Sequence, residues 1–100
     1  MLARAWDFRQ RRHARGVWFR LRRVLADASA AWVISDDDAR RLVSEDCRPE
    51  SVGAELEPPK LILFATAEQI SRLPSARAVP VRLGGELLAA RCLALARFGT

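Results

Sequence analysis

The stretch AAWVISDDDARRLV, residues 30–43, holds the two signals on which the predicted fold depends. Its first half is a short apolar run with β-branched and aromatic members, which is typical of a buried strand. Ser35 and three aspartates follow, and a hydroxyl side chain before acids is a common helix start because acids favour the positive end of the helix dipole. We therefore expect a strand over 30–35 and a helix over 36–46.

A helix is also expected before this strand. Apolar residues at positions 17, 18, 21, 24, 25 and 28 recur with helical spacing and fall in one stripe. On a helical wheel Leu21, Val24 and Leu25 lie in that stripe, so this face should pack on the core. The helix should end near Ser29.

The chain after residue 46 continues the alternation of helices and strands. Residues 47–60 hold three of the five prolines and form the longest connection. LILFA, residues 61–65, is apolar on both faces, so we expect a central strand that is covered on both sides. Thr66 and Gln69 then predict a capping box at the start of a short helix.

Two more elements are predicted near the C-terminal end of the sequence. VPVRL, residues 79–83, alternates and is expected at a sheet edge, because Pro80 has no N–H for a ladder bond. Residues 86–98 predict a last helix that is apolar on almost all sides, which must be buried by the rest of the fold or by a second copy. The candidate residues for a homo-oligomer interface on this helix are Leu88, Leu93 and Leu95.

This order of elements predicts an α/β fold. We expect a small sheet of about three mainly parallel strands with helices on both faces, because helices and strands alternate along the chain. An α+β fold with a hairpin in the 47–60 region is the alternative. A length of 100 residues corresponds to one domain. We place that domain at residues 16–100, with residues 1–15 as a basic arm or an extension of the first helix.

Positive charge is concentrated at one end of the sequence. Residues 1–23 contain eight arginines and one acid, Asp7, so they carry +7, and the rest of the chain carries −2 of the net charge of +5. Lys60 is the only lysine. Arginine suits bidentate contacts with phosphate, but an arginine excess is also typical of a GC-rich, bacterial-like coding composition.

A candidate binding surface follows from the helical wheel. Phe19 falls on the side opposite the apolar stripe, among arginines, where guanidinium groups could contact phosphates while the ring stacks on a base. An acidic protein surface would be attracted to the same charge. Alternatively, Phe19 packs under another segment and the arginines are only solvated. The candidate residues are Arg11, Arg12, Arg15, Phe19, Arg22 and Arg23.

A second constellation lies at the predicted strand ends. In a parallel sheet Asp36, Thr66 and Arg82 would converge at one edge, where α/β folds place ligands. An acid, a hydroxyl and a cation there would suit Mg²⁺-assisted phosphate chemistry. The simpler interpretation is that Asp36 and Thr66 only begin helices.

The cysteines and the apolar runs bear on location. Cys47 and Cys92 are far apart and form no CxxC pair, which predicts free thiols in a reducing compartment and no metal site. No apolar run approaches the roughly 20 residues that cross a bilayer, and none has signal-peptide length. We therefore expect a cytoplasmic protein, with an organelle transit peptide as the alternative for the Arg-rich start.

These patterns predict a small binding or assembly-component domain rather than an enzyme. Its expected partner is nucleic acid or an acidic protein, contacted through the basic helix, and no cofactor is expected. Two alternatives stay open: a Mg-dependent phosphate-handling enzyme that uses the strand ends, and a homo-oligomeric structural protein.

Overall fold

The computed structural model describes residues 19–82 and 84–99. Residues 19–25 are helical and lead into the first strand. The elements that follow are β1 (Ala28–Val33), α2 (Asp36–Ser44), α3 (Ser51–Glu55), β2 (Leu61–Phe64), α4 (Ala67–Ser71), β3 (Arg77–Val79), α5 (Gly85–Ala89) and β4 (Cys92–Arg97).

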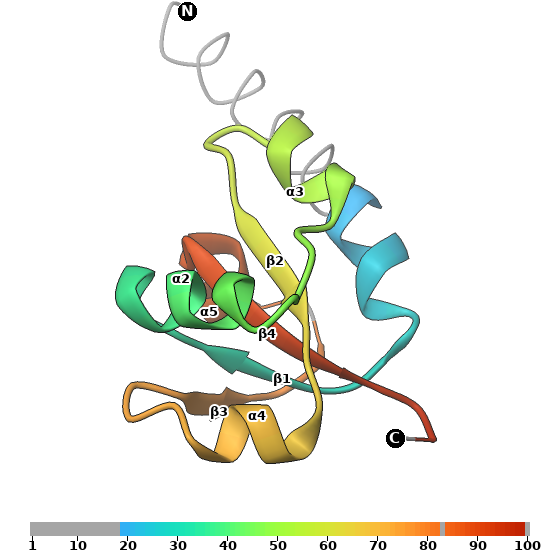
Figure 1. Ribbon diagram of the computed structural model, residues 1–100. Helices are drawn as coiled ribbons and strands as arrows, with labels where there is room; N and C mark the ends of the chain where they lie inside the picture. The colour runs from blue at the N-terminus through green and yellow to red at the C-terminus, as the bar shows by residue number, and fades with distance from the viewer. Residues whose placement is uncertain (1–18, 83, 100) are drawn as a thin grey trace, which may run out of the picture.

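The four described strands form one mixed sheet in the order β2-β4-β1-β3 (Figure 1). β4 pairs in parallel with β2, whereas β1 is antiparallel to both of its neighbours, β4 and β3. The α/β class is therefore confirmed, but the expected sheet of three mainly parallel strands is wrong. A fourth strand is present, and the central β1 runs against the other three. The 47–60 connection contains α3 rather than a hairpin.

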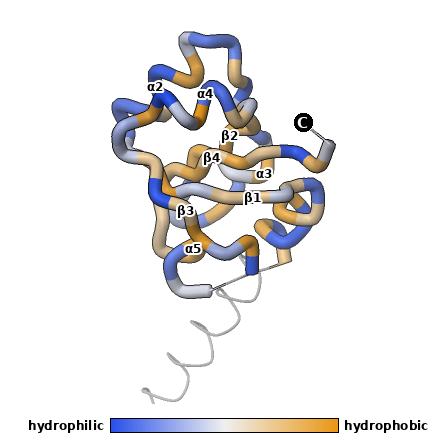
Figure 2. Tube along the Cα trace, turned by 90° about the horizontal axis from the view of Figure 1, so that it is seen from below, coloured by the Kyte–Doolittle hydropathy of each residue, from blue (hydrophilic) through white to orange (hydrophobic). Residues whose placement is uncertain are grey.

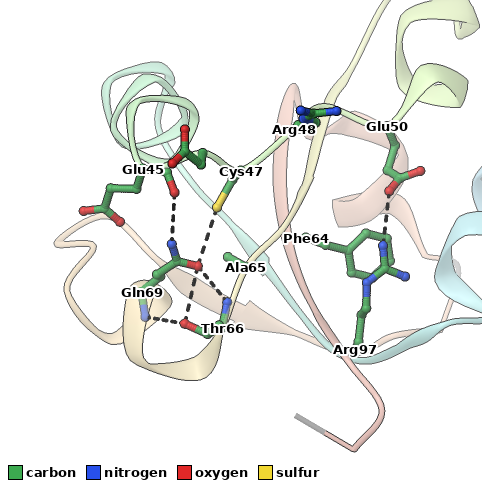
Figure 3. A pocket seen from close by; sticks show the side chains of 10 residues that line it. Glu45, Cys47, Arg48, Glu50, Phe64, Ala65, Thr66, Gln69 and Arg97 are labelled. Atoms are coloured by element: carbon green, nitrogen blue, oxygen red, sulfur yellow. Dashed lines mark hydrogen bonds and ion pairs between the residues drawn. The ribbon is translucent and has the colours of Figure 1, made fainter.

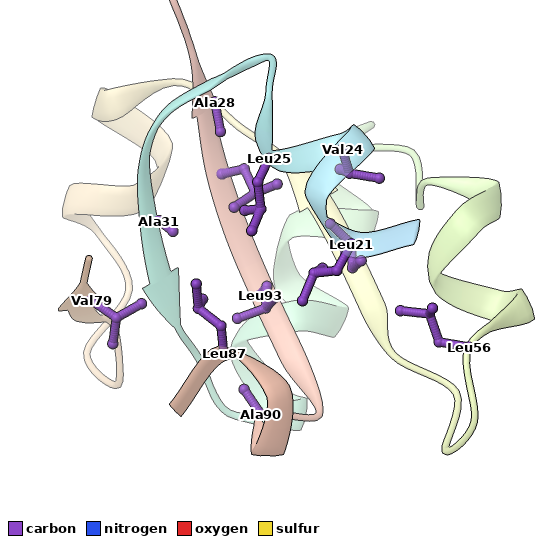
Figure 4. Close-up of a cluster of buried hydrophobic side chains, with 12 residues drawn as sticks. Leu21, Val24, Leu25, Ala28, Ala31, Leu56, Val79, Leu87, Ala90 and Leu93 are labelled. Atoms are coloured by element: carbon purple, nitrogen blue, oxygen red, sulfur yellow. The ribbon is translucent and has the colours of Figure 1, made fainter. Parts of the chain in front are cut away.

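Helices cover both faces of the sheet, as predicted. On one face, side chains of the helical segment 19–25 and of α5, such as Leu21, Leu25 and Leu87, pack on Leu93 and Leu95 of β4 (Figure 4). On the other face, α2 and α4 pack on the alternate residues of the same strands. Figure 2 shows α2 and α4 on one side of the sheet and α5 on the other, with apolar residues concentrated in β2 and β4.

Two predicted helix starts are confirmed by their hydrogen bonds. The Asp38 N–H donates to Ser35 Oγ (3.2 Å), so Ser35 caps α2. Thr66 and Gln69 form the predicted capping box at α4, in which the Gln69 N–H donates to Thr66 Oγ1 (3.1 Å). These local signals survive in the fold because the first N–H groups of a helix need acceptors wherever the helix lies.

The prediction of a last helix over 86–98 is wrong beyond residue 89. The helical part, α5, ends at its C-cap Ala90, and residues 92–97 form the central strand β4. Leu93 and Leu95 face one core, and the smaller residues that alternate with them, Cys92, Ala94 and Ala96, face the other. Burial on both faces of the sheet outweighs the helix propensity of Leu and Ala. Because Leu93 and Leu95 are fully buried by their own chain, they offer no surface to a second copy.

The expected positions of the other two strands both need correction. β2, the LILF segment, is covered on both faces as predicted, but it lies at the end of the sheet order rather than at its centre. Its outer side is partly covered by the chain itself, since Pro49 bridges Leu63 and the Glu50 N–H donates to the Ile62 carbonyl (2.8 Å). The edge strand expected over 79–83 is wrong in its position: β3, at the other end of the sheet order, is Arg77–Val79, and Pro80 follows the strand instead of lying within it.

Candidate functional site

The helical segment 19–25 presents two different faces. Leu21, Val24 and Leu25 are buried in the core, as the wheel predicted, because their spacing places them on the side that meets the sheet. The outward residues of the segment include Phe19, whose side chain is 64% exposed. The ring therefore points away from the core.

Arginines accompany the exposed ring. Arg22 and Arg23 are both exposed, and neither side chain forms a hydrogen bond or an ion pair with the part of the chain that the structure describes. Arg20 behaves differently, because its Nη1 donates to the Glu55 carbonyl at the end of α3 (3.1 Å). Arg20 thus attaches the segment to the body of the domain, whereas no described residue accepts a hydrogen bond from the guanidinium groups of Arg22 and Arg23. The predicted Arg11, Arg12 and Arg15 and the arm 1–15 lie outside the described residues.

The structure adds a second exposed ring beside this segment. Phe98, which directly follows β4, is 68% exposed. Its N–H donates to the carbonyl oxygen of Asp27 (3.4 Å), in the turn after the helical segment. Figures 1 and 2 both place the helical segment and the end of β4 on the same side of the molecule. We call the four residues Phe19, Arg22, Arg23 and Phe98 the aromatic–arginine surface.

Sequence reasoning missed Phe98 because it placed this residue at the end of a buried helix. The signal that could have found it is the alternation of large and small residues in CLALAR, 92–97, which has a period of two. A strand over these residues leaves Phe98 just outside the sheet.

A pocket of about 390 Å³ lies next to this surface, at the carboxyl ends of β2 and β4 (Figure 3). The Arg97 guanidinium sits over the Phe64 ring, 3.9 Å from its centroid, and its Nη2 lies 3.6 Å from Glu50 Oε1. These contacts fix the side chain of Arg97, the residue that precedes Phe98. The other residues that line the pocket are Glu45, Asp46, Cys47, Arg48, Ala65, Thr66 and Gln69.

Gln69 organises the far side of this pocket. Its Oε1 accepts from the Thr66 N–H (3.0 Å) and from Cys47 Sγ (3.5 Å), and its Nε2 donates to the Glu45 carbonyl (3.5 Å). Burial raises the pKa of the Cys47 thiol, and the charges of Glu45 and Asp46 add to this effect. A thiol in such surroundings is a poor nucleophile. The hydrogen bonds of Gln69 therefore serve mainly to cap α4. The pocket is lined by three acids and two arginines, so its net negative charge disfavours the binding of anions.

The predicted phosphate site is not assembled. Asp36 lies at the amino end of β4, where Cys92 Sγ donates to its Oδ1 (3.2 Å) and Arg91 Nη1 is 3.7 Å from its Oδ2. Thr66 lies past the carboxyl end of β4, since the neighbouring Ala65 N–H donates to the Leu95 carbonyl (2.9 Å). The two residues are thus at opposite ends of the sheet, because β1 runs antiparallel to β2.

The third member of that constellation, Arg82, is exposed and lines a separate pocket beside Glu86. Among the described residues, no group of three or more His, Cys, Asp or Glu side chains is placed to hold a metal ion.

Lys60 and Cys92 are buried groups near the amino ends of β2 and β4. The Lys60 ammonium donates to the carbonyls of Leu88 (2.6 Å) and Ala90 (2.5 Å) at the end of α5, where the last carbonyls of a helix have no partner within the helix. Burial lowers the pKa of Lys60. The pKa of the Cys92 thiol is raised to about 11, first by burial and then by its bond to Asp36 and the charge of that carboxylate. The hydrogen bonds of Lys60 and Cys92 satisfy buried polar groups and do not position either group for catalysis.

No described helix is long and apolar enough to cross a membrane. The chain matches no protein-family model, no curated protein and no solved structure.

Proposed function

We propose that this chain is a non-catalytic binding domain whose aromatic–arginine surface contacts nucleic acid. The observation that carries the proposal is the pair of exposed guanidiniums, Arg22 and Arg23, which have no partner among the described residues and lie beside the exposed ring of Phe19 on a helix whose other face is buried. An exposed guanidinium without an acidic partner is free to form charge-assisted hydrogen bonds with a phosphate.

The charge of the whole segment supports this choice of partner. Residues 1–23 carry +7 in the sequence, and electrostatic attraction to phosphates accounts for most non-specific nucleic-acid binding. An acidic protein would be attracted by the same charge. However, a stable protein interface usually has a contiguous apolar centre, and the outward neighbours of Phe19 on its helix are Arg22 and Arg23. A ring whose neighbours on the helix are cations suits a base and its phosphates better.

The surface is also held in place. Leu21 and Leu25 anchor the helical segment in the core, and Arg20 bonds to the end of α3. Groups that are ordered before binding lose less conformational entropy when the ligand arrives.

The other two candidate functions rest on residues that the fold does not place where those functions need them. Asp36 and Thr66 lie at opposite ends of the sheet, and Leu93 and Leu95 are in the core. We therefore do not propose a phosphate-handling enzyme or an oligomer built on the C-terminal leucines.

The test is the salt dependence of binding, measured by fluorescence anisotropy with labelled oligonucleotides, for the full chain and for the double variant Arg22→Gln/Arg23→Gln. We expect the slope of log affinity against log salt to fall by roughly 1.4 to 1.8 in the variant, since each lost phosphate contact releases about 0.7 to 0.9 fewer counterions.

The matched control is Arg40→Gln/Arg72→Gln, which removes the same charge from exposed positions on α2 and beside α4. It should leave the slope unchanged. Equal losses in the two variants would contradict the proposal, because binding would then depend only on net charge. Binding to polyglutamate without binding to any oligonucleotide would identify an acidic protein as the partner instead.

A further inference from the structure

We infer that the nucleic acid bound by this surface is single-stranded, with unpaired bases stacked on Phe19 and Phe98. This inference rests on the proposed function and names the class of nucleic acid.

The exposed aromatic rings of the described residues gather at this surface. The large hydrophobic side chains exposed in that part of the chain are Phe19, Phe98 and Val43, so the two aromatic members both belong to the aromatic–arginine surface. Phe64 is half-buried under Arg97, and Trp32 is half-buried within β1. Two bare rings on one side of a small domain form a pair of stacking platforms.

Stacking separates single strands from duplexes. In a duplex the faces of the bases are already stacked on each other, and proteins contact the base edges through hydrogen bonds from the grooves. A phenylalanine ring has no hydrogen-bonding group with which to contact an edge. In a single strand the base faces are free, and aromatic side chains commonly bind them whatever the base.

The arrangement of the four residues fits a strand that crosses the surface. The helical residues 19–25 rise about 9 Å along their axis, and the turn at Asp27, which bonds to Phe98, comes directly after them. Arg22 and Arg23 lie between Phe19 and that turn. A strand that follows this line meets a ring, two guanidiniums and a second ring, which suits alternating bases and phosphates.

The backbone of Phe98 is fixed although its ring is exposed. The main-chain bond to Asp27 holds it on one side, and the preceding Arg97 is held by Phe64 and Glu50. The second platform is therefore positioned by the end of the sheet rather than by a free tail.

The experiment compares a labelled twelve-nucleotide oligo-dT with the same labelled strand in a duplex, using the full chain and the variants Phe19→Ala, Phe98→Ala and Val43→Ala. We expect the wild-type chain to bind the single strand more tightly than the duplex. Each phenylalanine variant should weaken single-strand binding about tenfold and leave duplex binding unchanged. Val43→Ala, which trims the third exposed hydrophobic side chain, should change neither.

Leucine variants at the same two positions test whether the ring itself matters. Phe19→Leu and Phe98→Leu keep an apolar side chain without a π-face, so they should lose as much affinity as the alanine variants. Leucine variants that bind the single strand with wild-type affinity would show that the bases do not stack on these rings, and would overturn the inference.

Failure of the inference differs from failure of the proposed function. Equal affinity for duplex and single strand, with Arg22→Gln/Arg23→Gln weakening both, would overturn only the single-strand inference. The absence of salt-dependent binding to either probe would overturn both. A concentration-dependent dimer that Phe19→Ala/Phe98→Ala dissociates would also overturn the inference, because a second copy would then be the partner of the rings.

Discussion

The main-chain N–H of Phe98 donates to the carbonyl oxygen of Asp27, at 3.4 Å, and so joins the end of β4 to the turn after the first described helix. This bond places an exposed ring next to a helix that bears a second one, although the two phenylalanines are far apart in the sequence. The surface therefore depends on the sheet register as much as on the helix. Variants that test the packing of the sheet therefore also test whether Phe98 lies beside the helical segment 19–25.

Leu93→Ala should lower the free energy of unfolding by about 2–5 kcal/mol, because it leaves a cavity in a fully buried position of the central strand. Chemical denaturation followed by circular dichroism measures this change. Leu88→Ala, at a half-buried position of α5, is the control and should cost clearly less. A small effect of Leu93→Ala on stability, together with a change of oligomeric state, would indicate that Leu93 lies in the oligomer interface predicted from the sequence.

Gly53→Ala should destabilise the protein by about 1–3 kcal/mol. A Cβ atom at Gly53 would lie 2.6 Å from the carbonyl oxygen of Lys60 and 3.1 Å from Ile62 Cγ1, so backbone would have to move. Gly85→Ala has no atom within 4 Å of its new Cβ and begins a helix, so it should be neutral or slightly stabilising. Equal melting temperatures for the two variants would show that α3 does not approach β2 so closely.

The three aspartates of α2 should differ in their effect on stability. Asp38 is buried, and its Oδ2 accepts from the Ser75 N–H (2.9 Å) and from the Ser75 hydroxyl. Asp38→Ala removes the acceptor of a partly buried N–H and should cost about 1–3 kcal/mol. The Asp37 side chain is 88% exposed and pairs with Arg40, which is 76% exposed, so Asp37→Ala should change the unfolding free energy by less than about 0.5 kcal/mol. A larger loss in Asp37→Ala than in Asp38→Ala would contradict this placement of α2.

Cys92 should react slowly with thiol reagents. Its pKa is raised from 9.0 to about 11, so at pH 8 the thiolate is about 100-fold scarcer than in the unfolded chain. Reaction of the Cys47→Ala variant with a disulfide reagent measures Cys92 alone, since the chain has two cysteines. Asp36→Asn in that background should speed the reaction, because it removes the negative charge beside the thiol. An unchanged rate would show that Asp36 does not affect Cys92.

The same thiol affects stability at high pH. Because the folded-state pKa of Cys92 lies above the unfolded value of 9.0, its contribution to the unfolding free energy is complete below about pH 9 and is lost as pH rises towards 11. The Cys92→Ala variant should therefore lose less stability than the wild-type chain between pH 9 and pH 11. An identical loss in both proteins would contradict the raised pKa.

Local features of the fold were predictable from the sequence. Ser35 and Thr66 begin helices as expected, because capping depends on a few neighbouring residues. The buried stripe of Leu21, Val24 and Leu25 was predictable for the same reason, since helical spacing alone determines which residues share a face.

Features that depend on tertiary packing were predicted wrongly or not at all. Leu93 and Leu95 lie in a segment rich in Leu and Ala, which favour a helix in isolation, and only burial between two helical layers makes it a strand. The three aspartates look alike in the sequence, yet Ser75 and Cys92, which are distant in the chain, determine their different surroundings. The position of Phe98 depends on that same unpredicted strand.

The most direct test of the account is the affinity of the full chain for a labelled twelve-nucleotide single strand across a series of salt concentrations, for the wild type and for Arg22→Gln/Arg23→Gln. The account predicts tight binding at low salt that falls steeply as salt rises, and a salt slope smaller by about 1.4 in the variant. A chain that does not bind at low salt, or a variant with the wild-type slope, would contradict the account.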